Sequence, residues 1–430
     1  MRPRRNLTCI IASIPASLVV GTILMAACAA PDFAEGGDET TTAFEGARLI
    51  IGDGAVIEDG VFLVETDHFI KVGGRKDVEI PVTSIRVDLS GKTVMPAIVN
   101  THIHLESERS ERALQLKHMG YYGAGAVVSL GLDSGDAPFE MRDEIMPDTP
   151  RSGTAGRGIT SPEPGRSEVP FWVATEAEAR DAVQELAAQS VDIVKIWVDD
   201  RGGRYGKLSA VLYGAIIDEA HQHGLLVTAH VFYLEDAKGL LRAGIDAFAH
   251  GIRDLDIDDE LVALWTERPS VVLVPNLPSP GVVLDLGWLS GTVPSLELQQ
   301  MQEASVDRPA AREAFGIQAR NLARLNKAGV KIAFGTDGSA AWAVHQEMED
   351  MVRSGMTPAD VIVAATGSSA ELMGWNNIGT VTAEKSADFI VLDENPLEDI
   401  THTRRIAAVY LRGSEVERQV VRARFIGEVE

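Results

Sequence analysis

Between Thr93 and His104 the chain reads T-V-M-P-A-I-V-N-T-H-I-H, an apolar run that ends in two histidines. Side chains of a β-strand point alternately to its two faces, so His102 and His104 share one face. Two imidazoles placed in this way can bind one metal ion. A strand can also end in two structural histidines, so the motif gains its meaning from the sequence around it.

The strand is the first of a series in which apolar strands alternate with amphipathic helices. The predicted strands are 93–104, 125–131, 151–159, 192–198, 226–231, 247–251, 271–275 and 331–336. Helices are predicted, for example, at 175–189, 209–223, 234–243 and 308–327. Such alternation is typical of a parallel sheet, and the count of strands favours a closed (β/α)8 TIM barrel of the α/β class.

Short strands separated by turns flank this middle part. We expect residues 44–92 and 380–430 to pair into a small β-sandwich domain, with the barrel at 93–379. One of the C-terminal strands is predicted at 420–426. The long segment 277–307 follows the seventh barrel strand and is expected to act as a lid or substrate loop over the barrel mouth.

The first 28 residues have the layout of an export signal. Arg2, Arg4 and Arg5 precede an apolar stretch that ends in L-M-A-A-C. This ending resembles a lipobox, which predicts a lipid anchor at Cys28, a flexible tether at 29–43, and a periplasmic or outer-membrane-anchored protein. Plain signal cleavage and an uncleaved membrane anchor are the alternatives.

Composition excludes several partners and sites. A formal net charge of −24 argues against nucleic acid and against peripheral binding to an anionic membrane surface. Both cysteines lie within the first 30 residues, so the remaining chain has neither an internal disulfide nor a cysteine-based zinc site.

Other strand ends carry residues that bind metals or move protons. They are Lys195 in the fourth strand, His230 after the fifth, His250 after the sixth and Asp337 after the eighth. Burial lowers the pKa of a lysine, and a neutral amine reacts with carbon dioxide to give a carbamate able to bridge two metal ions. The alternative for Lys195 is an ammonium that reaches solvent. Together these residues lie at the strand ends where such barrels keep their active sites.

These motifs resemble those of the amidohydrolase superfamily, in its binuclear, carboxylated-lysine subtype. V-M-P-A-I-V-N-T-H-I-H resembles the first-strand motif of that family, and 379–397 resembles its return into the sandwich. The resemblance implies two Zn²⁺ ions per chain, although Co²⁺ or Mn²⁺ can replace zinc at such ligands.

The resemblance also implies a role for each ligand. His102, His104 and Asp337 would bind the more buried zinc, His230 and His250 the more exposed one, and carboxylated Lys195 would bridge them. A hydroxide shared by the zinc ions would attack an amide carbonyl, and Asp337 would pass its proton to the leaving amine.

Two other functions stay open at this stage. Mononuclear deaminases of the superfamily place H-x-x-E after the fifth strand and lack the lysine, whereas here His230 is followed by V-F-Y-L-E and Lys195 is present. A non-catalytic binding lipoprotein is the other alternative, and it would not need the complete ligand set.

The stretch V-D-I-V-K-I-W-V-D-D-R-G-G-R-Y-G-K-L-S resembles a narrower group, which includes Xaa-Pro dipeptidases (prolidases) and bacterial ochratoxin A amidohydrolases. This implies a small-molecule substrate with a free carboxylate, for which an N-acyl amino acid of the ochratoxin A type, releasing phenylalanine, is preferred over an Xaa-Pro dipeptide. Tyr233, Arg253 and His345 are the candidate substrate-binding residues. The family resemblance also implies a homo-oligomer, with an octamer as one form.

Overall fold

The computed structural model describes residues 41–426. The predicted leader, Cys28 and most of the predicted tether lie outside this range. Strand β1 (Thr42–Ile50) begins inside the predicted tether. Of the helices within the described residues, none is both long and apolar enough to cross a membrane.

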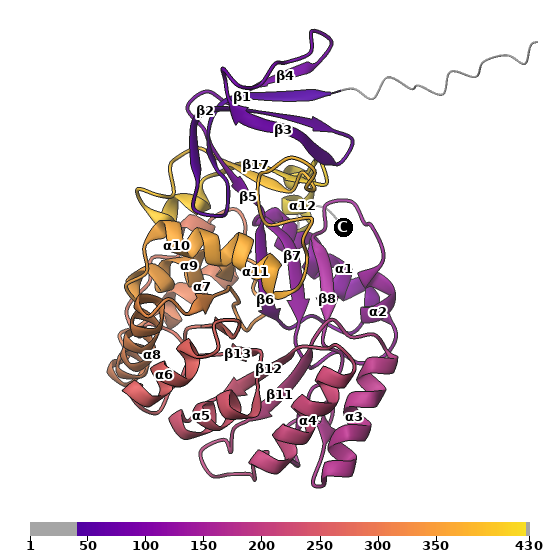
Figure 1. The fold of residues 1–430 in the computed structure, drawn as a ribbon. Coiled ribbons are helices and arrows are strands. Elements are labelled where there is room, and N and C mark those ends of the chain that lie inside the picture. The colour runs from indigo at the N-terminus through magenta and orange to yellow at the C-terminus, as the bar shows by residue number, and fades with distance from the viewer. Residues whose placement is uncertain (1–40, 427–430) are drawn as a thin grey trace, which may run out of the picture. The chain divides into compact units, whose positions relative to one another are not determined.

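Strands from both ends of the described chain form one mixed sheet (Figure 1). Its order is β18-β17-β16-β5-β1-β2-β3, and β4 also pairs with β1. Its further strands are β2 (Val56–Glu65), β3 (His68–Gly74), β4 (Ile85–Asp88), β5 (Thr93–Pro96), β16 (Phe389–Leu392), β17 (Ile406–Leu411) and β18 (Ser414–Glu415). The hydrogen bonds define a single sheet, so the two stacked sheets of a β-sandwich stay a prediction.

Aromatic rings fill one face of the mixed sheet. Phe44 stacks on Phe62 at 4.8 Å between ring centroids, and Phe389 stacks on Tyr410 at 4.5 Å. Phe44 comes from the N-terminal part and Phe389 from the C-terminal part, and their rings meet edge to face at 5.3 Å. Burial of these rings therefore holds the two ends of the chain together.

Two parallel sheets carry the middle of the chain. One has the order β6-β7-β8, and the other β10-β9-β11-β12-β13-β14-β15. The strands are β6 (Ile98–Ile103), β7 (Ala124–Ser129), β8 (Arg151–Thr154), β9 (Ile159–Thr160), β10 (Phe171–Trp172), β11 (Val194–Val198), β12 (Val227–Val231), β13 (Ala247–Ala249), β14 (Val272–Val274) and β15 (Lys331–Ile332). Each of the eight predicted strand segments overlaps an observed strand, and the predicted α/β class is confirmed.

Backbone hydrogen bonds connect the two parallel sheets at two places. At one junction, the amide of Thr101 donates to the carbonyl of Phe334 at 2.9 Å, and the amide of Thr336 donates to the carbonyl of His102 at 3.0 Å. At the other, the amide of Asp192 donates to the carbonyl of Thr154 at 2.9 Å. The carboxyl ends of the strands are thereby brought to one side.

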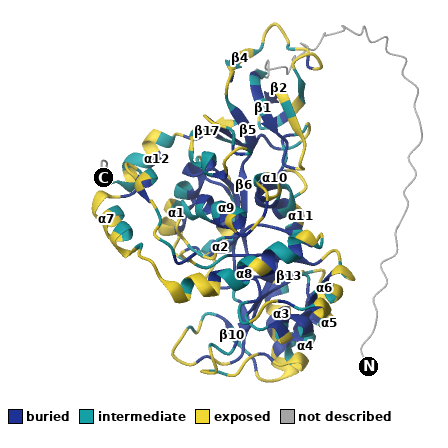
Figure 2. Ribbon diagram, turned by 90° about the vertical axis from the view of Figure 1, so that its left-hand side faces the viewer, coloured by how far each residue is buried: buried dark blue, intermediate teal, exposed yellow. Residues whose placement is uncertain are grey.

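Helices lie outside these strands, with their exposed faces outward (Figure 2). They are α1 (Arg109–Tyr121), α2 (Ala137–Arg142), α3 (Glu176–Ala188), α4 (Ala210–Gln222), α5 (Leu234–Ala243), α6 (Asp259–Thr266), α7 (Ser295–Ala304), α8 (Pro309–Lys327), α9 (Ala343–Arg353), α10 (Pro358–Val363), α11 (Ser369–Leu372) and α12 (Arg418–Phe425). The sequence encodes their starts locally. Thr175 and Glu178, for example, form a reciprocal capping box at α3.

Two segments differ from the sequence-based prediction. Residues 420–426, predicted as a strand, lie mostly in helix α12. The segment 277–307, expected to act as a lid or substrate loop, contains helix α7, none of whose residues is buried. Its role as a lid stays a prediction.

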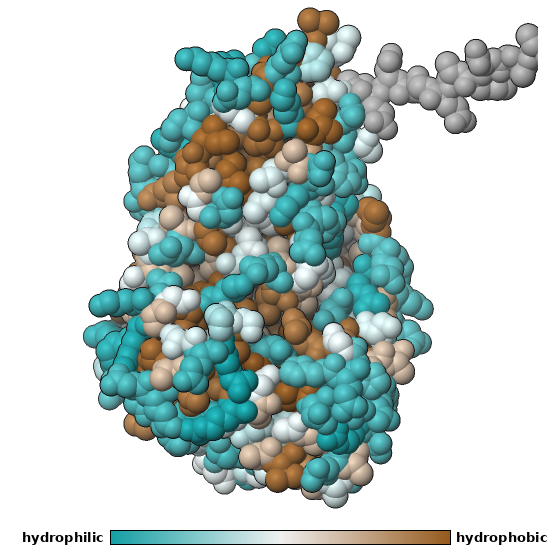
Figure 3. Space-filling model, viewed as in Figure 1, coloured by the Kyte–Doolittle hydropathy of each residue, from teal (hydrophilic) through white to brown (hydrophobic). Residues whose placement is uncertain are grey.

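Hydrophobic surface on the face drawn in Figure 3 gathers mainly over the mixed sheet, and hydrophilic residues cover most of the remainder. The exposed apolar side chains of this sheet and its connections include Val56, Ile70, Val82 and Ile85. The parallel strands instead bury their apolar side chains, and every residue of β6, β7, β11 and β12 is buried.

Candidate metal centre

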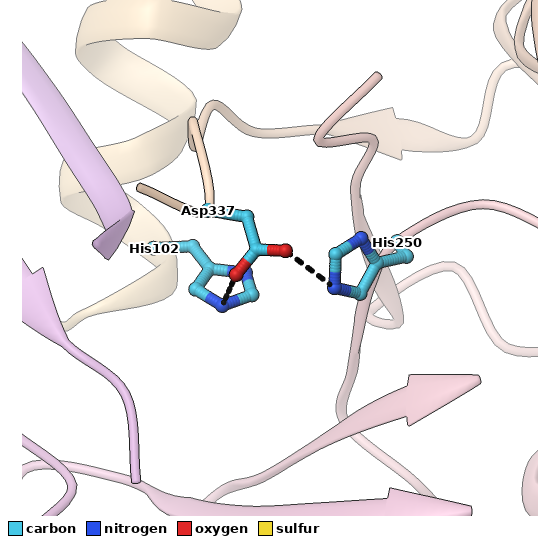
Figure 4. A group of neighbouring side chains, drawn as sticks. All are labelled: His102, His250 and Asp337. Atoms are coloured by element: carbon cyan, nitrogen blue, oxygen red, sulfur yellow. Dashed lines mark ion pairs between the residues drawn. The ribbon is translucent and has the colours of Figure 1, made fainter. Parts of the chain in front are cut away.

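Asp337 joins two histidines from different strands at the carboxyl ends of the parallel strands (Figure 4). Its Oδ1 lies 3.0 Å from Nε2 of His102, and its Oδ2 lies 3.3 Å from Nε2 of His250. The three residues each offer one ligand atom, and these atoms lie within 4.8 Å of one another. The structure thus brings together His102 and Asp337, expected at the more buried zinc, with His250, which was expected at the more exposed one.

His104 reaches the same carboxylate. Its Nε2 lies 3.0 Å from Oδ1 of Asp337, and its ring centroid is 5.4 Å from that of His102. The side chain is 28% exposed, whereas that of His102 is 1% exposed. His104 thus extends the group toward solvent.

The charge states within this group suit metal binding. Burial, aided by the charge of Lys195, lowers the pKa of His102 to about 3, so its imidazole is neutral at pH 7. Burial also lowers the pKa of His250 well below its ordinary value. Burial alone would raise the pKa of Asp337, but the neighbouring histidines lower it overall, which keeps the carboxylate ionised. Neutral imidazole and ionised carboxylate are the forms that bind metal ions.

Lys195 lies fully buried in β11 beside this group. Its Nζ is 3.4 Å from Nε2 of His102. Burial lowers the pKa of Lys195 to about 7, because the opposing charge of Asp337 only partly compensates, and Arg253 and Arg201 lower it further. An appreciable fraction of the amine is therefore neutral at pH 7.

His230 makes different contacts from the other histidines. Its ring centroid is 4.5 Å from that of His250, but its Nε2 lies 3.0 Å from Oδ2 of Asp199 and 3.2 Å from Nη1 of Arg201. Arg201 in turn contacts the buried Glu163, with 3.2 Å between Nε and Oε1. The nitrogen expected to bind a second metal ion is thus engaged by a charged network.

The backbone is strained at three positions of the site. His250 has φ 101°, Asp337 φ 52° and Asn276 φ 43°, all in the left-handed region that glycine favours. Strained residues outside glycine cost roughly 1–3 kcal/mol each and concentrate at functional sites. Each follows a parallel strand, so the strain occurs where the chain turns to direct a side chain into the site.

The three predicted substrate-binding residues, Arg253, Tyr233 and His345, differ in their contacts. Arg253 lies close enough to Asp337 and Asp199 to sense their charges, and its buried Nε and Nη2 find no hydrogen-bond partner among residues 41–426. Tyr233 donates its hydroxyl to Oδ1 of Asp200 at 2.7 Å, which raises the pKa of Tyr233 to about 12.

His345 is the third case, and its contacts do not support the expected place at the mouth. Its Nδ1 lies 3.1 Å from Oγ1 of Thr403, and its ring meets those of Tyr122 and Trp288. The buried aromatic surroundings explain why burial lowers its pKa to about 3. His345 packs in the core and is not brought to the histidine group.

Sequence reasoning missed the polar partners of the predicted ligands. They are Asn276, Asp199, Arg201 and Glu163. Asp199 directly follows β11 and Asn276 lies two residues after β14, both at carboxyl ends of parallel strands. Their position after a parallel strand was the feature from which the sequence could have predicted them.

The donor set fits a metal ion of the kind that imidazole and carboxylate prefer, such as zinc. The buried Nε2 of His250 makes no hydrogen bond to any residue that the structure describes, although it faces Oδ2 of Asp337 at 3.3 Å. A cation bound between the two would satisfy both groups.

Residues 171–416, more than half of the chain, match the amidohydrolase family. The protein belongs to this family, and its members are hydrolases.

Three relatives illustrate the range of the family. An uncharacterised protein of Mycobacterium tuberculosis is 26% identical over 366 residues, which cover 80% of this chain and 90% of that protein. Aspergillus niger ochratoxinase is 25% identical over 296 residues, covering 65% of this chain and 55% of the enzyme. Its crystal structure matches with a TM-score of 0.68 and 19% identity, covering 87% and 95% of the two chains. A prolidase-like protein from Bifidobacterium longum matches with a TM-score of 0.72 and 26% identity, covering 91% and 99%.

Proposed function

We propose that this protein is a metal-dependent amidohydrolase that cleaves the amide bond of an N-acyl amino acid with a free carboxylate. An ochratoxin A-type substrate, which would release phenylalanine, is the favoured form. Similarity to ochratoxinase and to a prolidase-like protein supports an amide or peptide bond. Xaa-Pro dipeptides are the alternative substrates of the same site.

The observation that carries this proposal is the buried, unpartnered guanidinium of Arg253. Within the described chain, its Nε and Nη2 have no acceptor, although both atoms are buried. A guanidinium binds a carboxylate through paired hydrogen bonds, which are about twice as strong as neutral ones. Arg253 follows His250 by three residues, so a carboxylate held there would bring the neighbouring amide toward the histidine group.

The proposed cofactor is a pair of zinc ions held by His102, His104, His230, His250, Asp337 and Lys195. When bound, the ions supply Lewis-acid polarisation of the scissile carbonyl and a nucleophile at neutral pH. Lys195 would be carboxylated by CO₂, for which the buried, readily deprotonated amine is suited. Tyr233 would line the substrate side from its place beside Asp200.

Asp337 is the proposed acid–base residue. Its ionised carboxylate accepts a proton from the attacking water and returns it to the leaving amine. A single carboxylate can do both because the proton it accepts as a base is the one it then donates as an acid.

The proposal also includes the closed barrel, the export of the protein and its oligomeric state. We infer that the strands β6, β7, β8, β11, β12, β13, β14 and β15 close into a (β/α)8 barrel, supported by the backbone hydrogen bonds that connect β6 with the chain after β15 and β8 with the chain before β11. We also infer that the protein is exported and forms a homo-oligomer, on the export-type leader and the family resemblance.

The test compares Arg253→Met with Arg320→Met. Arg320 is a matched control because it is exposed and pairs with Asp256 outside the site. Released amino acid is measured from ochratoxin A, N-acyl amino acids and Xaa-Pro dipeptides, with and without a chelator. Chelator-sensitive release is expected, with KM about 100-fold higher in Arg253→Met, corresponding to about 2.7 kcal/mol, and unchanged in Arg320→Met.

Each result separates the hypotheses. Release from Xaa-Pro alone would identify a prolidase. An equal KM in Arg253→Met and the native protein would remove Arg253 as the carboxylate site. No chelator-sensitive release from any amide would overturn the proposed substrate class.

A further inference from the structure

A buried asparagine contacts the side of His102 that faces away from Asp337. Nδ2 of Asn276 lies 2.7 Å from Nδ1 of His102, and the residues are 5% and 1% exposed. The other amide atom, Oδ1 of Asn276, is buried and lacks a hydrogen-bond partner in the part of the chain that the structure describes. Asn276 is thus the immediate neighbour of one ring nitrogen, while the other ring nitrogen faces the metal centre.

The two nitrogens of an imidazole are chemically linked. A neutral histidine that binds a metal ion through Nε2 carries its proton on Nδ1, and this N–H needs an acceptor. The amide of asparagine offers an acceptor and a donor of nearly the same shape, and a half-turn about its last side-chain bond exchanges them. With Oδ1 turned toward His102, the amide accepts from Nδ1–H.

We propose that Asn276 is the positioning residue of His102. In the metal-bound protein its Oδ1 accepts the Nδ1–H hydrogen bond, which fixes the ring orientation and leaves the lone pair of Nε2 free for the metal ion. This inference rests on the proposed metal centre, and it assigns to Asn276 a role toward the metal rather than toward the substrate.

The fold holds Asn276 in place by two further contacts. The carboxylate of Glu347, itself buried, accepts the backbone N–H of Leu277 at 3.0 and 3.1 Å, which secures the turn just after Asn276 and its left-handed backbone. Gly335 leaves room on the other side, because a Cβ there would lie 2.5 Å from Oδ1 of Asn276. Because Asn276 is held by its backbone and by its surroundings, it can fix the orientation of the His102 ring.

The experiment measures zinc affinity of the metal-free protein by competition with a chelator, without substrate. Asn276→Leu keeps the approximate size and loses the acceptor, whereas Asn276→Asp keeps an acceptor. Loss of an outer hydrogen bond to a ligand histidine typically costs 10–100-fold in metal affinity, so a loss of about this size is expected for Asn276→Leu. Asn276→Asp is expected to bind zinc at least as tightly as the native protein.

Asn321→Leu is the control for removing a buried amide. Asn321 is 2% exposed and bonds only to backbone groups of Ile252, Leu255 and Ile257 among the contacts described. It is expected to lower stability while leaving zinc affinity unchanged.

A second measurement reads the native protein and does not depend on any variant of Asn276. In the zinc-loaded native protein with ¹⁵N-labelled histidine, the His102 resonance, assigned through its loss in His102→Gln, should show a proton on Nδ1 that is protected from exchange.

The outcomes are distinguishable. Native affinity in Asn276→Leu, equal loss in Asn276→Asp and Asn276→Leu, or an unprotonated Nδ1 would overturn the role of Asn276 alone. Failure of the native protein to bind zinc would overturn the metal centre and this inference together. Tight zinc binding without amide hydrolysis would leave the role of Asn276 intact and overturn only the proposed substrate class.

Discussion

The histidine group has two sides that differ in how ready they are for a metal ion. On one side, nitrogens of His102 and His250 already face the oxygens of Asp337 at 3.0 and 3.3 Å. On the other, Nε2 of His230 is engaged by Asp199 and Arg201 at 3.0 and 3.2 Å. The first side is preorganised around one carboxylate, whereas on the second side Arg201 contacts the histidine that we propose as a ligand.

Histidines at equivalent strand ends therefore need not contribute equally to the free energy of metal binding. His230 and His250 end neighbouring strands, β12 and β13, and their rings are 4.5 Å apart. An arginine near His230 opposes a cation there, because like charges repel strongly in a buried site. We therefore expect two metal ions to bind in sequence, with the ion at Asp337 binding first.

The largest expected effect comes from the carboxylate on the preorganised side. Asp337→Asn should lower kcat at least about 1000-fold, because it removes both a metal ligand and the proposed proton carrier. Asp199→Asn is the matched variant on the other side and should lower kcat about 10-fold or less. Steady-state rates on one N-acyl amino acid, with metal content of each variant, provide the comparison. Similar losses in the two variants would contradict the difference between the sides.

A smaller effect is expected at Lys195, the residue proposed to bridge the two zinc ions. Lys195→Met should weaken binding of one of two zinc ions at least about 100-fold, since the loss of a direct ligand exceeds that of an outer contact. Zinc titration followed by mass analysis measures the stoichiometry. With ¹³C-bicarbonate, the native protein should give a carbamate resonance that is absent from Lys195→Met. A full complement of tightly bound zinc in the variant would remove Lys195 from the ligand set.

The smallest effect is expected when the positive charge of Arg201 beside His230 is removed. Arg201→Met should tighten the weaker zinc step about 10-fold, equivalent to about 1.4 kcal/mol, because a positive charge next to His230 disappears. The tighter step should not change. Arg242→Met, an exposed arginine paired with Glu260, is the control, and zinc titration of both variants measures the change. Weaker binding in Arg201→Met would show that the arginine supports the second side.

The regular part of the fold could be predicted because burial imposes a pattern on the sequence. Apolar strand segments and amphipathic helices such as α3 and α8 appear directly in the order of residues. Helix α12 could not be predicted in this way. Its valine-rich sequence R-Q-V-V-R-A-R-F favours a strand, yet Val421 is buried in the core and Phe425 stacks on His118 at 3.7 Å. Tertiary packing has here overridden local preference.

The ligand residues could be predicted for a similar reason, and their partners could not. His102, His230 and His250 lie within one residue of the carboxyl ends of their strands, a position that the sequence reveals. Asp337 follows β15 and Lys195 lies within β11, and both were found from the same strand pattern. Asn276 contacts His102 across 174 residues of sequence, and an asparagine after a strand is also an ordinary turn residue. Only the three-dimensional arrangement distinguishes those two roles. His345 was predicted at the mouth from its nearness in sequence to Asp337, but helix α9 directs it toward Thr403.

The shared sheet also constrains how the chain is made on the ribosome. Strand β5 pairs with β1 on one side and with β16 on the other, and β16 to β18 lie between Phe389 and Glu415. The edge of β5 therefore stays unpaired until nearly the whole chain has been synthesised. Domains tend to fold from the N-terminus as they emerge, and exposed strand edges promote aggregation. A nascent chain that stalls before Phe389 would carry β5 without its C-terminal partner β16, so the mixed sheet would stay incomplete.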